Sequence, residues 1–250
     1  MQTPEVIKVE STHDTSSIAQ HFYKVEGSEA RDEALANLLL THQPESAVVF
    51  CNTKKEVQSV ADELHRKGFS VIDIHGDLEQ RERDQALVQF ANKSVSILVA
   101  TDVAARGLDV DNLDAVFNFE LSRDPEVHVH RIGRTGRAGS KGLAFSFFGE
   151  KDGLRVARIE EYLDMDVVPA TLPAKSNQQP YQAKMVTINI DGGKKQKVRP
   201  GDILGCLTGK NGIPGSQVGK IHLFPMRAYV AVEKSAAKKA LQTISNGKMK

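Results

Sequence analysis

The sequence is poor in cysteine and has no long apolar run. Its two cysteines, Cys51 and Cys206, are too few for a disulfide framework or a cysteine-rich zinc site. No segment approaches the ~20 consecutive apolar residues that a membrane-spanning helix needs. The first residues, Met1–Glu5, do not form the basic stretch and apolar run of a secretory signal peptide. We therefore expect reduced thiols, no membrane association and a cytoplasmic location.

A phosphate-binding loop of the Gly-x-x-x-x-Gly-Lys-Ser/Thr type is also missing. The nearest match, residues 205–211 (Gly-Cys-Leu-Thr-Gly-Lys-Asn), is one residue short between its glycines. It ends in Asn211, where the motif has the hydroxyl that binds magnesium. The sequence therefore lacks the loop that holds nucleotide phosphates in this class of site.

Acidic residues are scarce in the last third of the chain. The formal net charge of the whole chain is +1. Residues 1–170 carry 19 Lys and Arg against 29 Asp and Glu, a net charge of −10. Residues 171–250 carry 14 Lys and Arg against 3 Asp and Glu, a net charge of +11. This difference predicts two modules, of which the basic one contacts a polyanion.

Strand-like and helix-like patterns alternate over residues 1–170. The strand-like runs are short and apolar, as expected for strands covered on both faces; they are 47–51, 70–74, 96–100, 115–119 and 143–148. Helical patterns occupy 28–42, 54–67, 79–91 and 151–163. In the helix at 54–67, Val57, Val60 and Leu64 share one apolar face, and Gly68 is placed to end it. The alternation predicts an α/β fold with a doubly wound parallel sheet.

Residues 171–180 form a segment rich in Pro, Ser, Asn and Gln, which we interpret as a linker. A different pattern follows over residues 181–250: strand 185–190, helix 199–208, strands 218–223 and 227–232, and helix 235–244. This β-α-β-β-α order predicts a small α+β domain of the split βαβ type. The last strand of that motif is lacking, so we expect this domain to be truncated.

Polar strings follow several predicted strands of the first module. They are 48–53, 75–77, 80–83, 98–109 and 130–137. The last of them, His-Arg-Ile-Gly-Arg-Thr-Gly-Arg, presents planar, permanently charged groups that suit phosphate oxygens. Thr101 and Asp102 come just after a strand, where ligands bind in open α/β sheets. Taken singly, solvated loops, helix caps and turns explain these strings equally well.

In this order and spacing the strings resemble the motifs of the C-terminal, RecA-like lobe of DEAD-box RNA helicases. Residues 48–53 resemble helicase motif IV, 101–109 motif V and 130–137 motif VI, and Gln80 with Arg83 matches the Gln-x-x-Arg element. The resemblance covers residues 1–170. His130 and Thr135 favour the DEAD-box group over its DEAH-box relatives.

The resemblance implies a role for each motif residue. Arg134 and Arg137 would be catalytic arginine fingers that reach the γ-phosphate of ATP and stabilise charge in the transition state. Asp109, with Gly107 of the same motif, would contact the nucleotide. The RNA backbone would be lined by Asn52, Thr53, Gly76, Thr101 and Asp102. The residues that couple the two lobes or brace the others would be Gln80, Arg83, Arg106, His130 and Arg131. Surface salt bridges explain Arg83 and Arg106 nearly as well.

The same resemblance implies an N-terminal RecA-like lobe that this sequence does not contain. The Asp-Glu-Ala-Asp string is absent, as is the phosphate-binding loop. ATP and its magnesium would be held mainly by that lobe, which is therefore an expected partner. We expect the chain to be a monomeric fragment with no metal site of its own, inactive as an ATPase and helicase when alone.

The second module resembles a divergent RNA-recognition motif, in which aromatic residues on two central strands stack on bases. Thr187 stands at the aromatic position of the first strand, and only Tyr229 is kept on the second. Basic side chains would then carry more of the RNA binding. The candidates beside Tyr229 are Lys194, Lys195, Lys197, Arg199, Lys210, Lys220, Arg227, Lys238 and Lys239. Each lysine singly fits a solvated side chain, but the cluster favours an RNA-binding face.

Residues 197–203 (Lys-Val-Arg-Pro-Gly-Asp-Ile) and 224–230 (Phe-Pro-Met-Arg-Ala-Tyr-Val) resemble the DbpA subgroup of the family. That subgroup uses its tail domain to tether the helicase to a hairpin of large-subunit ribosomal RNA during ribosome assembly. One alternative is a non-enzymatic RNA-binding protein with a vestigial ATPase lobe, against which the intact Arg134, Arg137 and Asp109 argue. Another is a DNA helicase lobe, which motif VI and the tail disfavour.

Overall fold

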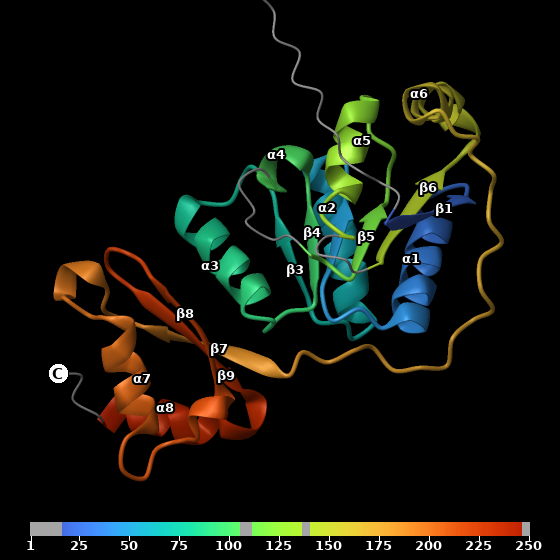
Figure 1. The fold of residues 1–250 in the computed structure, drawn as a ribbon. Helices are drawn as coiled ribbons and strands as arrows, with labels where there is room; N and C mark the ends of the chain where they lie inside the picture. The colour runs from blue at the N-terminus through green and yellow to red at the C-terminus, as the bar shows by residue number, and fades with distance from the viewer. Residues whose placement is uncertain (1–16, 106–111, 137–140, 247–250) are drawn as a thin grey trace, which may run out of the picture.

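The computed structural model describes residues 17–105, 112–136 and 141–246, and its first module is built on a six-stranded parallel sheet (Figure 1). The strand order is β1-β6-β5-β2-β4-β3. The strands are β1 Ile18–Lys24, β2 Ala47–Phe50, β3 Val71–Ile74, β4 Ile97–Ala100, β5 Ala115–Asn118 and β6 Gly142–Phe148. The helices are α1 Ser28–His42, α2 Lys54–Arg66, α3 Gln80–Ala91, α4 Asp102–Ala105, α5 Pro125–Ile132 and α6 Gly153–Leu163. The predicted doubly wound α/β fold is confirmed.

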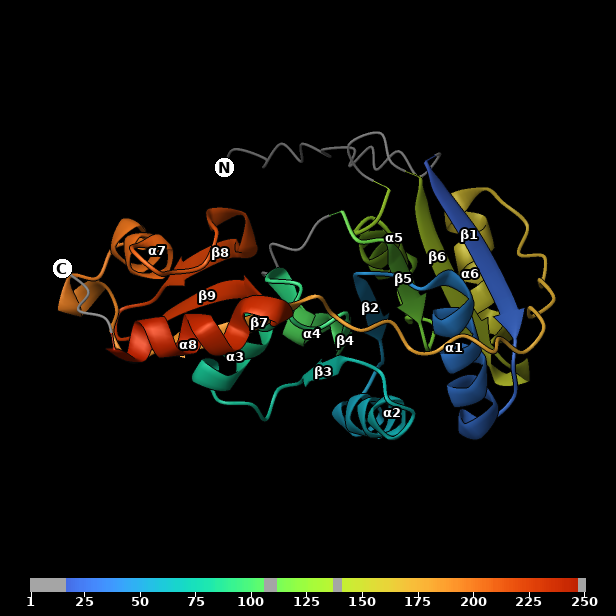
Figure 2. The same ribbon diagram turned by 90° about the horizontal axis from the view of Figure 1, so that it is seen from below.

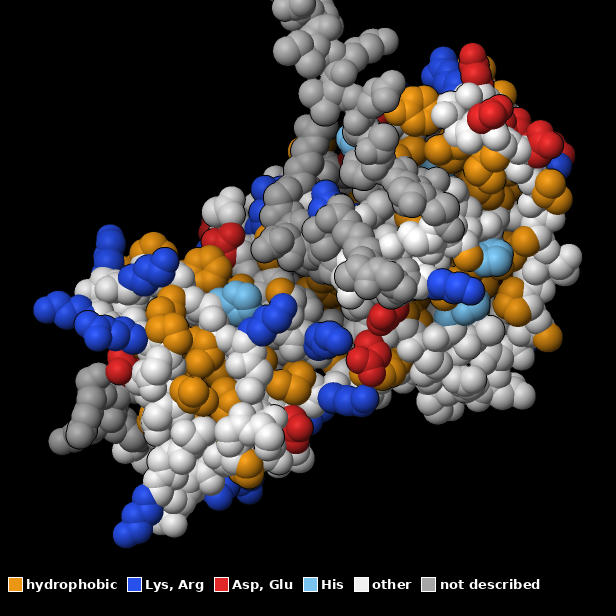
Figure 3. Space-filling view, in the orientation of Figure 1, with side chains coloured by type: hydrophobic (Ala, Val, Ile, Leu, Met, Phe, Trp, Pro, Cys, Tyr) orange, Lys and Arg blue, Asp and Glu red, His pale blue; other side chains and the backbone are white. Residues whose placement is uncertain are grey.

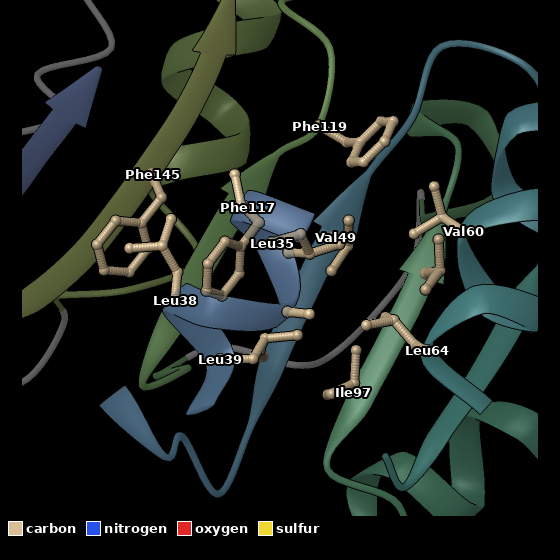
Figure 4. Close-up of a cluster of buried hydrophobic side chains, with 14 of the residues drawn as sticks. Leu35, Leu38, Leu39, Val49, Val60, Leu64, Ile97, Phe117, Phe119 and Phe145 are labelled. Carbon is tan, nitrogen blue, oxygen red and sulfur yellow. The ribbon is translucent and has the colours of Figure 1, made fainter. Parts of the chain in front are cut away.

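The sheet has a separate core on each face, because side chains alternate along its strands. Val49 of β2 belongs to the cluster that contains Leu35 of α1 and Leu64 of α2 (Figure 4). Its neighbour Val48 belongs to the opposite cluster, with Phe90 of α3. Both faces of the sheet are therefore buried, which explains why the sequences of these strands are nearly continuous apolar runs.

Helix α2 illustrates how the sequence sets the ends of an element. The side chain of Thr53 accepts a hydrogen bond from the amide of Glu56 (3.2 Å) and caps the first turn. Val57 and Leu64 lie on the buried face. Gly68, just after the helix, adopts φ +84°. This left-handed backbone conformation is energetically unfavourable for a residue with a Cβ atom.

Strand β1 is an element that the sequence pattern does not predict. It pairs in parallel with β6, from Ile18 beside Gly142 to Lys24 beside Phe148. Only two of its residues, Phe22 and Tyr23, are buried. Polar residues dominate the rest, so pairing with the apolar β6, and not its own pattern, makes this segment a strand.

The segment predicted as a linker, 171–180, lies against α1. The side-chain amide of Asn37 donates to the carbonyl oxygen of Pro173 (2.9 Å) and accepts from the amide of Ser176 (2.8 Å). Further along, the side chain of Gln43 donates to the carbonyl oxygen of Gln179 (3.1 Å). The linker is therefore an extended strap that follows the first module, as Figure 2 shows.

The second module is an antiparallel three-stranded sheet in the order β7-β9-β8 with two helices on one face. Its elements are β7 Met185–Ile190, α7 Pro200–Thr208, β8 Val218–Leu223, β9 Ala228–Glu233 and α8 Ala237–Asn246. Ile188, Ile203 and Val230 lie in its core. Within the described residues this is the predicted split βαβ domain without its last strand. No helix in this part of the chain has the length and apolar character to cross a membrane.

Candidate functional site

The strings predicted to carry chemistry meet at one edge of the first sheet. Strands β2, β4 and β3 are parallel neighbours, so their carboxyl ends lie side by side. Asn52 and Thr53 follow β2, Thr101 and Asp102 follow β4, and Gly76 follows β3. The fold therefore brings together segments that lie up to fifty residues apart in the sequence.

Arg131 of α5 holds this edge together. Its guanidinium pairs with the carboxylate of Asp102 through two hydrogen bonds, Nε to Oδ1 (2.6 Å) and Nη2 to Oδ2 (2.7 Å). The remaining N–H groups donate to Asn52 Oδ1 (3.1 Å), Asn118 Oδ1 (3.2 Å) and the carbonyl oxygen of Glu120 (2.8 Å). All five donors of the guanidinium are therefore used, although the side chain is only 1% exposed.

This network fits the bracing role predicted for Arg131, because all five donors of the buried guanidinium bond within the lobe. Both roles, bracing and coupling to a second lobe, stay predictions. Asn52 is held from both sides, because its Nδ2 also donates to the carbonyl oxygen of Leu121 (3.0 Å). Asp102 keeps 30% of its side chain exposed beside the arginine. The contacts of Asn52 and Asp102 with RNA stay predictions.

The rest of the edge offers hydroxyl groups, helix starts and open space. Thr53 caps α2, and the Thr101 hydroxyl accepts from the amide of Ala104 (3.3 Å). Gly76 is exposed, and a Cβ atom built on it has no neighbour within 4 Å. The N-terminus of α2 presents free N–H groups, which favour anions. These features suit a phosphodiester backbone.

The chain leaves α5 through a tight turn beside the start of β1. The amide of Leu113 donates to the carbonyl oxygen of Arg134 (3.0 Å), and the buried Thr135 hydroxyl bonds to Leu113. Gly136 has φ +72°, and a Cβ atom there would lie 2.7 Å from a side-chain carbon of Ile18. The second glycine of the string is therefore required by packing. Four predicted site residues, Arg106, Gly107, Asp109 and Arg137, lie outside the described residues.

The other predicted coupling residues lie on α3 and α5. Gln80 donates to Asp84 Oδ1 on the next turn (2.7 Å). Arg83 shares the helix face of Ala86 and Phe90 that packs on the lobe, and its Nε is buried without a hydrogen-bond partner among the described residues. His130 is half exposed, with its Nε2 4.0 Å from Glu126 Oε1. Their coupling to a second lobe stays a prediction.

The opposite face of α3 packs against the sheet of the second module, as Figure 1 and Figure 2 show. Asn92, at the end of α3, donates through Nδ2 to the hydroxyl of Thr187 (3.0 Å) and contacts His222 Nε2 through Oδ1 (3.0 Å). The Ser94 hydroxyl lies 2.7 Å from that of Thr187. Burial, and secondarily the charge of Lys220, lowers the pKa of His222 below its usual range.

Thr187 and Tyr229 lie on the sheet face that points away from the helices of the second module. Their strand neighbours Ile188 and Val230 lie in the domain core, and successive side chains point to opposite faces. Because this face is covered, Tyr229 is only 3% exposed. The face on which an RNA-recognition motif stacks bases is thus occupied in part by the first module, through Asn92 and Ser94, and the contact of Tyr229 with RNA stays a prediction.

The predicted basic contacts do not form a single cluster. Lys194, Lys195, Lys197 and Arg199 share one exposed loop, whereas Lys220 lies on β8, Lys210 follows α7, and Lys238 with Lys239 lies on α8. The loop packs on the turn between β8 and β9, because the amide of Lys194 donates to the carbonyl oxygen of Phe224 (3.0 Å). Figure 3 shows Lys and Arg side chains gathered over the second module.

Comparison with known proteins finds a separate family for each module. Residues 30–139 match the family described as the helicase conserved C-terminal domain, and residues 187–250 match the DbpA RNA binding domain. The ATP-dependent RNA helicase DbpA of Escherichia coli (strain K12) is 51% identical over 99% of this chain and 54% of its own length. The Bacillus subtilis (strain 168) protein of the same name is 32% identical over 100% of this chain and 57% of its own.

Solved structures agree with the lobe described above. The DEAD-box protein SrmB of E. coli, bound to the regulator RraA, superposes with a TM-score of 0.59 at 31% identity, over 65% of this chain and 96% of that one. The C-terminal domain of the DEAD-box protein Dbp5 gives 0.57 at 32% identity, over 62% and 92%. The chain belongs to the DEAD-box RNA helicase family. It spans about half the length of the curated DEAD-box relatives it matches.

Two features of this DEAD-box chain bear on metal and thiol chemistry. In the described ranges, no group of three or more His, Cys, Asp and Glu side chains is placed to hold a metal ion. Burial raises the pKa of the Cys51 thiol well above its usual range, so this cysteine is a packing residue and not a nucleophile.

Sequence reasoning missed two sets of residues in this DEAD-box chain. Asn118 and Glu120 complete the shell of Arg131, and an Asn that ends an apolar strand was a usable signal. Asn92, Ser94 and His222 join the two modules. Their sequence neighbourhood resembles any polar turn, so no local pattern indicates that contact.

Proposed function

We propose that this chain is the C-terminal part of an ATP-dependent RNA helicase that acts on ribosomal RNA during large-subunit assembly in the cytoplasm. The Arg131 network carries the proposal. It fixes the strands that end in Asn52 and Asp102 against the helix that leads to Arg134. A movement of the RNA-facing strings is thereby transmitted to the phosphate-facing string, which is what ATP-driven remodelling of RNA requires.

Arg134 and Arg137 are the proposed arginine fingers. Their guanidinium groups would contact the γ-phosphate and stabilise the charge that develops on it, which accelerates comparable reactions by about 10³–10⁵. The residue types present fit that role, because the string 130–137 supplies three arginines and two glycines. ATP with its magnesium would be held by the N-terminal lobe, and Asp109 and Gly107 would complete the nucleotide contacts.

The second module is the proposed RNA tether. Its net charge of +11 contrasts with −10 for the lobe, so the tether carries most of the affinity for free RNA. The target would be a hairpin of large-subunit ribosomal RNA, bound by a monomer. Because the sheet face is covered, the exposed loop with Lys194, Lys195 and Lys197 is better placed for the phosphates than the sheet itself.

Reconstitution with the N-terminal lobe tests the enzymatic part of this proposal. The N-terminal half of the E. coli relative is fused to this chain, and RNA-stimulated phosphate release is measured. Arg134→Ala is expected to lower turnover by at least about 10³, whereas Arg158→Ala, an exposed arginine of α6, leaves it unchanged. RNA binding without any ATP hydrolysis in the wild-type fusion would favour the non-enzymatic alternative.

Salt dependence tests the tether. Affinity for a single-stranded RNA should fall by about 0.7 log units per log unit of salt for each phosphate neutralised. Replacing Lys194 and Lys195 with Gln should lower that slope by about 1.4, whereas the same change at Lys24 and Lys151, exposed on the lobe, should not. Scrambled hairpins and matched DNA serve as competitors. A hairpin preference no greater than for scrambled RNA contradicts the ribosomal target.

A further inference from the structure

A groove at the junction of the two modules has not been assigned a role. It is formed by Arg81 and Asp84 of α3, the 224–227 turn between β8 and β9, and Tyr229. Its volume is about 270 Å³, just below the ~300 Å³ at which pockets for drug-sized molecules begin. The groove is therefore suited to one flat, compact group.

The walls of the groove are aromatic and apolar. The rings of Phe224 and Tyr229 pack edge to face, 5.6 Å apart at 89°. Tyr229 is buried and Phe224 is partly exposed, so Phe224 is the ring that a ligand reaches and Tyr229 supports it. Met226, on the turn, is 51% exposed although it is apolar. Planar aromatic rings and a polarizable thioether make favourable contacts with another flat π-system.

Polar groups converge on the same groove from both modules. Arg227 Nη1 is buried and has no hydrogen-bond partner among the described residues. Asp84, on the opposite wall, accepts from Gln80 through Oδ1 (2.7 Å), and a carboxylate has further acceptor capacity. A donor and an acceptor on facing walls match the edge of a nucleobase, which carries both kinds of group.

The surroundings of the groove are cationic. The amides of Lys194 and Lys195 donate to the carbonyl oxygens of Phe224 (3.0 Å) and Pro225 (2.9 Å), so their exposed side chains leave from a loop that sits on the groove's turn. Gly193, which precedes them, has no room for a Cβ atom against the backbone of this turn. A ligand whose flat group enters the groove thus has positive charge beside its ends, as a nucleotide phosphate needs.

We propose that this groove binds one unpaired nucleotide of the RNA, with its base between Phe224 and the α3 wall and its phosphates beside Lys194 and Lys195. The proposal rests on the proposed RNA-binding function and adds a specific site to it. The aromatic residue of the usual stacking face, Tyr229, is buried, whereas Phe224, just after β8, is partly exposed in the groove. Because Asp84 belongs to the lobe, the site is complete only when the two modules are in contact.

The test compares two single-stranded RNAs of equal length, one complete and one with abasic riboses, against the full chain. The readout is the ratio of the two affinities, which removes the contribution of the phosphates. Phe224→Ala should lower this ratio roughly 5- to 100-fold, the loss of one stacked base. Asp84→Ala, at a partly exposed position of α3, should lower it roughly 3- to 10-fold. Leu241→Ala, which truncates an exposed apolar side chain on α8 outside the groove, is the control.

If both variants keep the wild-type affinity ratio, the groove does not bind a base and the proposal is wrong. The same holds if a variant loses equal affinity for the complete and the abasic strand. Failure of the wild-type chain to bind either RNA would refute the RNA-binding function itself. A circular dichroism spectrum checks the fold of Phe224→Ala, and Asp84→Ala decides the question if that variant is unfolded. A 4-thiouridine strand should crosslink to peptides containing 224–229, and crosslinks only elsewhere would also overturn the proposal.

Discussion

At the scale of single residues, Arg131 makes five side-chain hydrogen bonds although its side chain is only 1% exposed. Its charge is compensated by Asp102 and by three further oxygen atoms, all inside the lobe. Arg131→Ala would leave Asp102 without its partner and two amide oxygens without donors. Removing one member of a buried pair typically costs about 3–5 kcal/mol, and we expect that loss in the free energy of unfolding measured with urea. Arg158→Ala should change it by less than about 0.5 kcal/mol, and an equally small change for Arg131→Ala would contradict this account.

His128 gives the lobe a specific response to acid. Burial, and secondarily the charge of Arg131, lowers its pKa to about 4. Between pH 6.5 and 4, His128 is therefore protonated in the unfolded chain but neutral in the folded chain. The stability from this group is complete above pH 6.5 and is lost as the pH falls toward 4, by up to about 3 kcal/mol.

His128→Phe keeps a ring against Phe22 but takes up no proton. Its urea midpoint should therefore fall less than that of the wild type between pH 6.5 and 4.5. His65→Gln, which removes an exposed histidine from α2, should follow the wild-type curve. Parallel curves for wild type and His128→Phe would show that this histidine is not the acid-sensitive group.

At the scale of elements, Thr53 links the start of α2 to the predicted RNA-facing edge. Its hydroxyl is the side-chain cap of this helix. Thr53→Ala should lower the free energy of unfolding by about 1 kcal/mol, and Thr53→Ser should restore most of it, because serine caps as well. Urea titrations of the three proteins measure this. If Thr53→Ser loses as much as Thr53→Ala, the methyl group and not the cap explains the effect.

The sequence predicts the helices and strands whose own residues carry the apolar pattern of that secondary structure. The strand at Ala47–Phe50 and the helix at Lys54–Arg66 each carry the required pattern, because the first is buried on both faces and the second on one. Strand β1 carries no such pattern and depends on its neighbour β6. The candidate edge was predictable as well, since parallel strands align their carboxyl ends. The complete set of partners of Arg131 was not, because these residues come from three separate segments of the chain.

At the scale of the whole molecule, the relation of the two modules was beyond the sequence. Thr187 could be recognised as an unusual residue on an RNA-recognition sheet, but its partners Asn92 and Ser94 lie more than ninety residues away. This contact gives a physical reason for a threonine at the position where an RNA-recognition motif has an aromatic residue. A hydroxyl on this face bonds to the polar end of α3, where an aromatic ring would have kept the modules apart.

Ala231 allows that contact to be broken selectively. It lies opposite Thr187 on the covered face and is 1% exposed. Ala231→Arg would place a charge between the modules, where its burial costs more than the contact contributes. The strap along α1 would still join them, so we expect separate tumbling in NMR relaxation and a larger radius of gyration in X-ray scattering. Ala157→Arg, exposed on α6, should leave both values unchanged. If Ala231→Arg also leaves both unchanged, the sheet face does not hold the modules together, and the strap does.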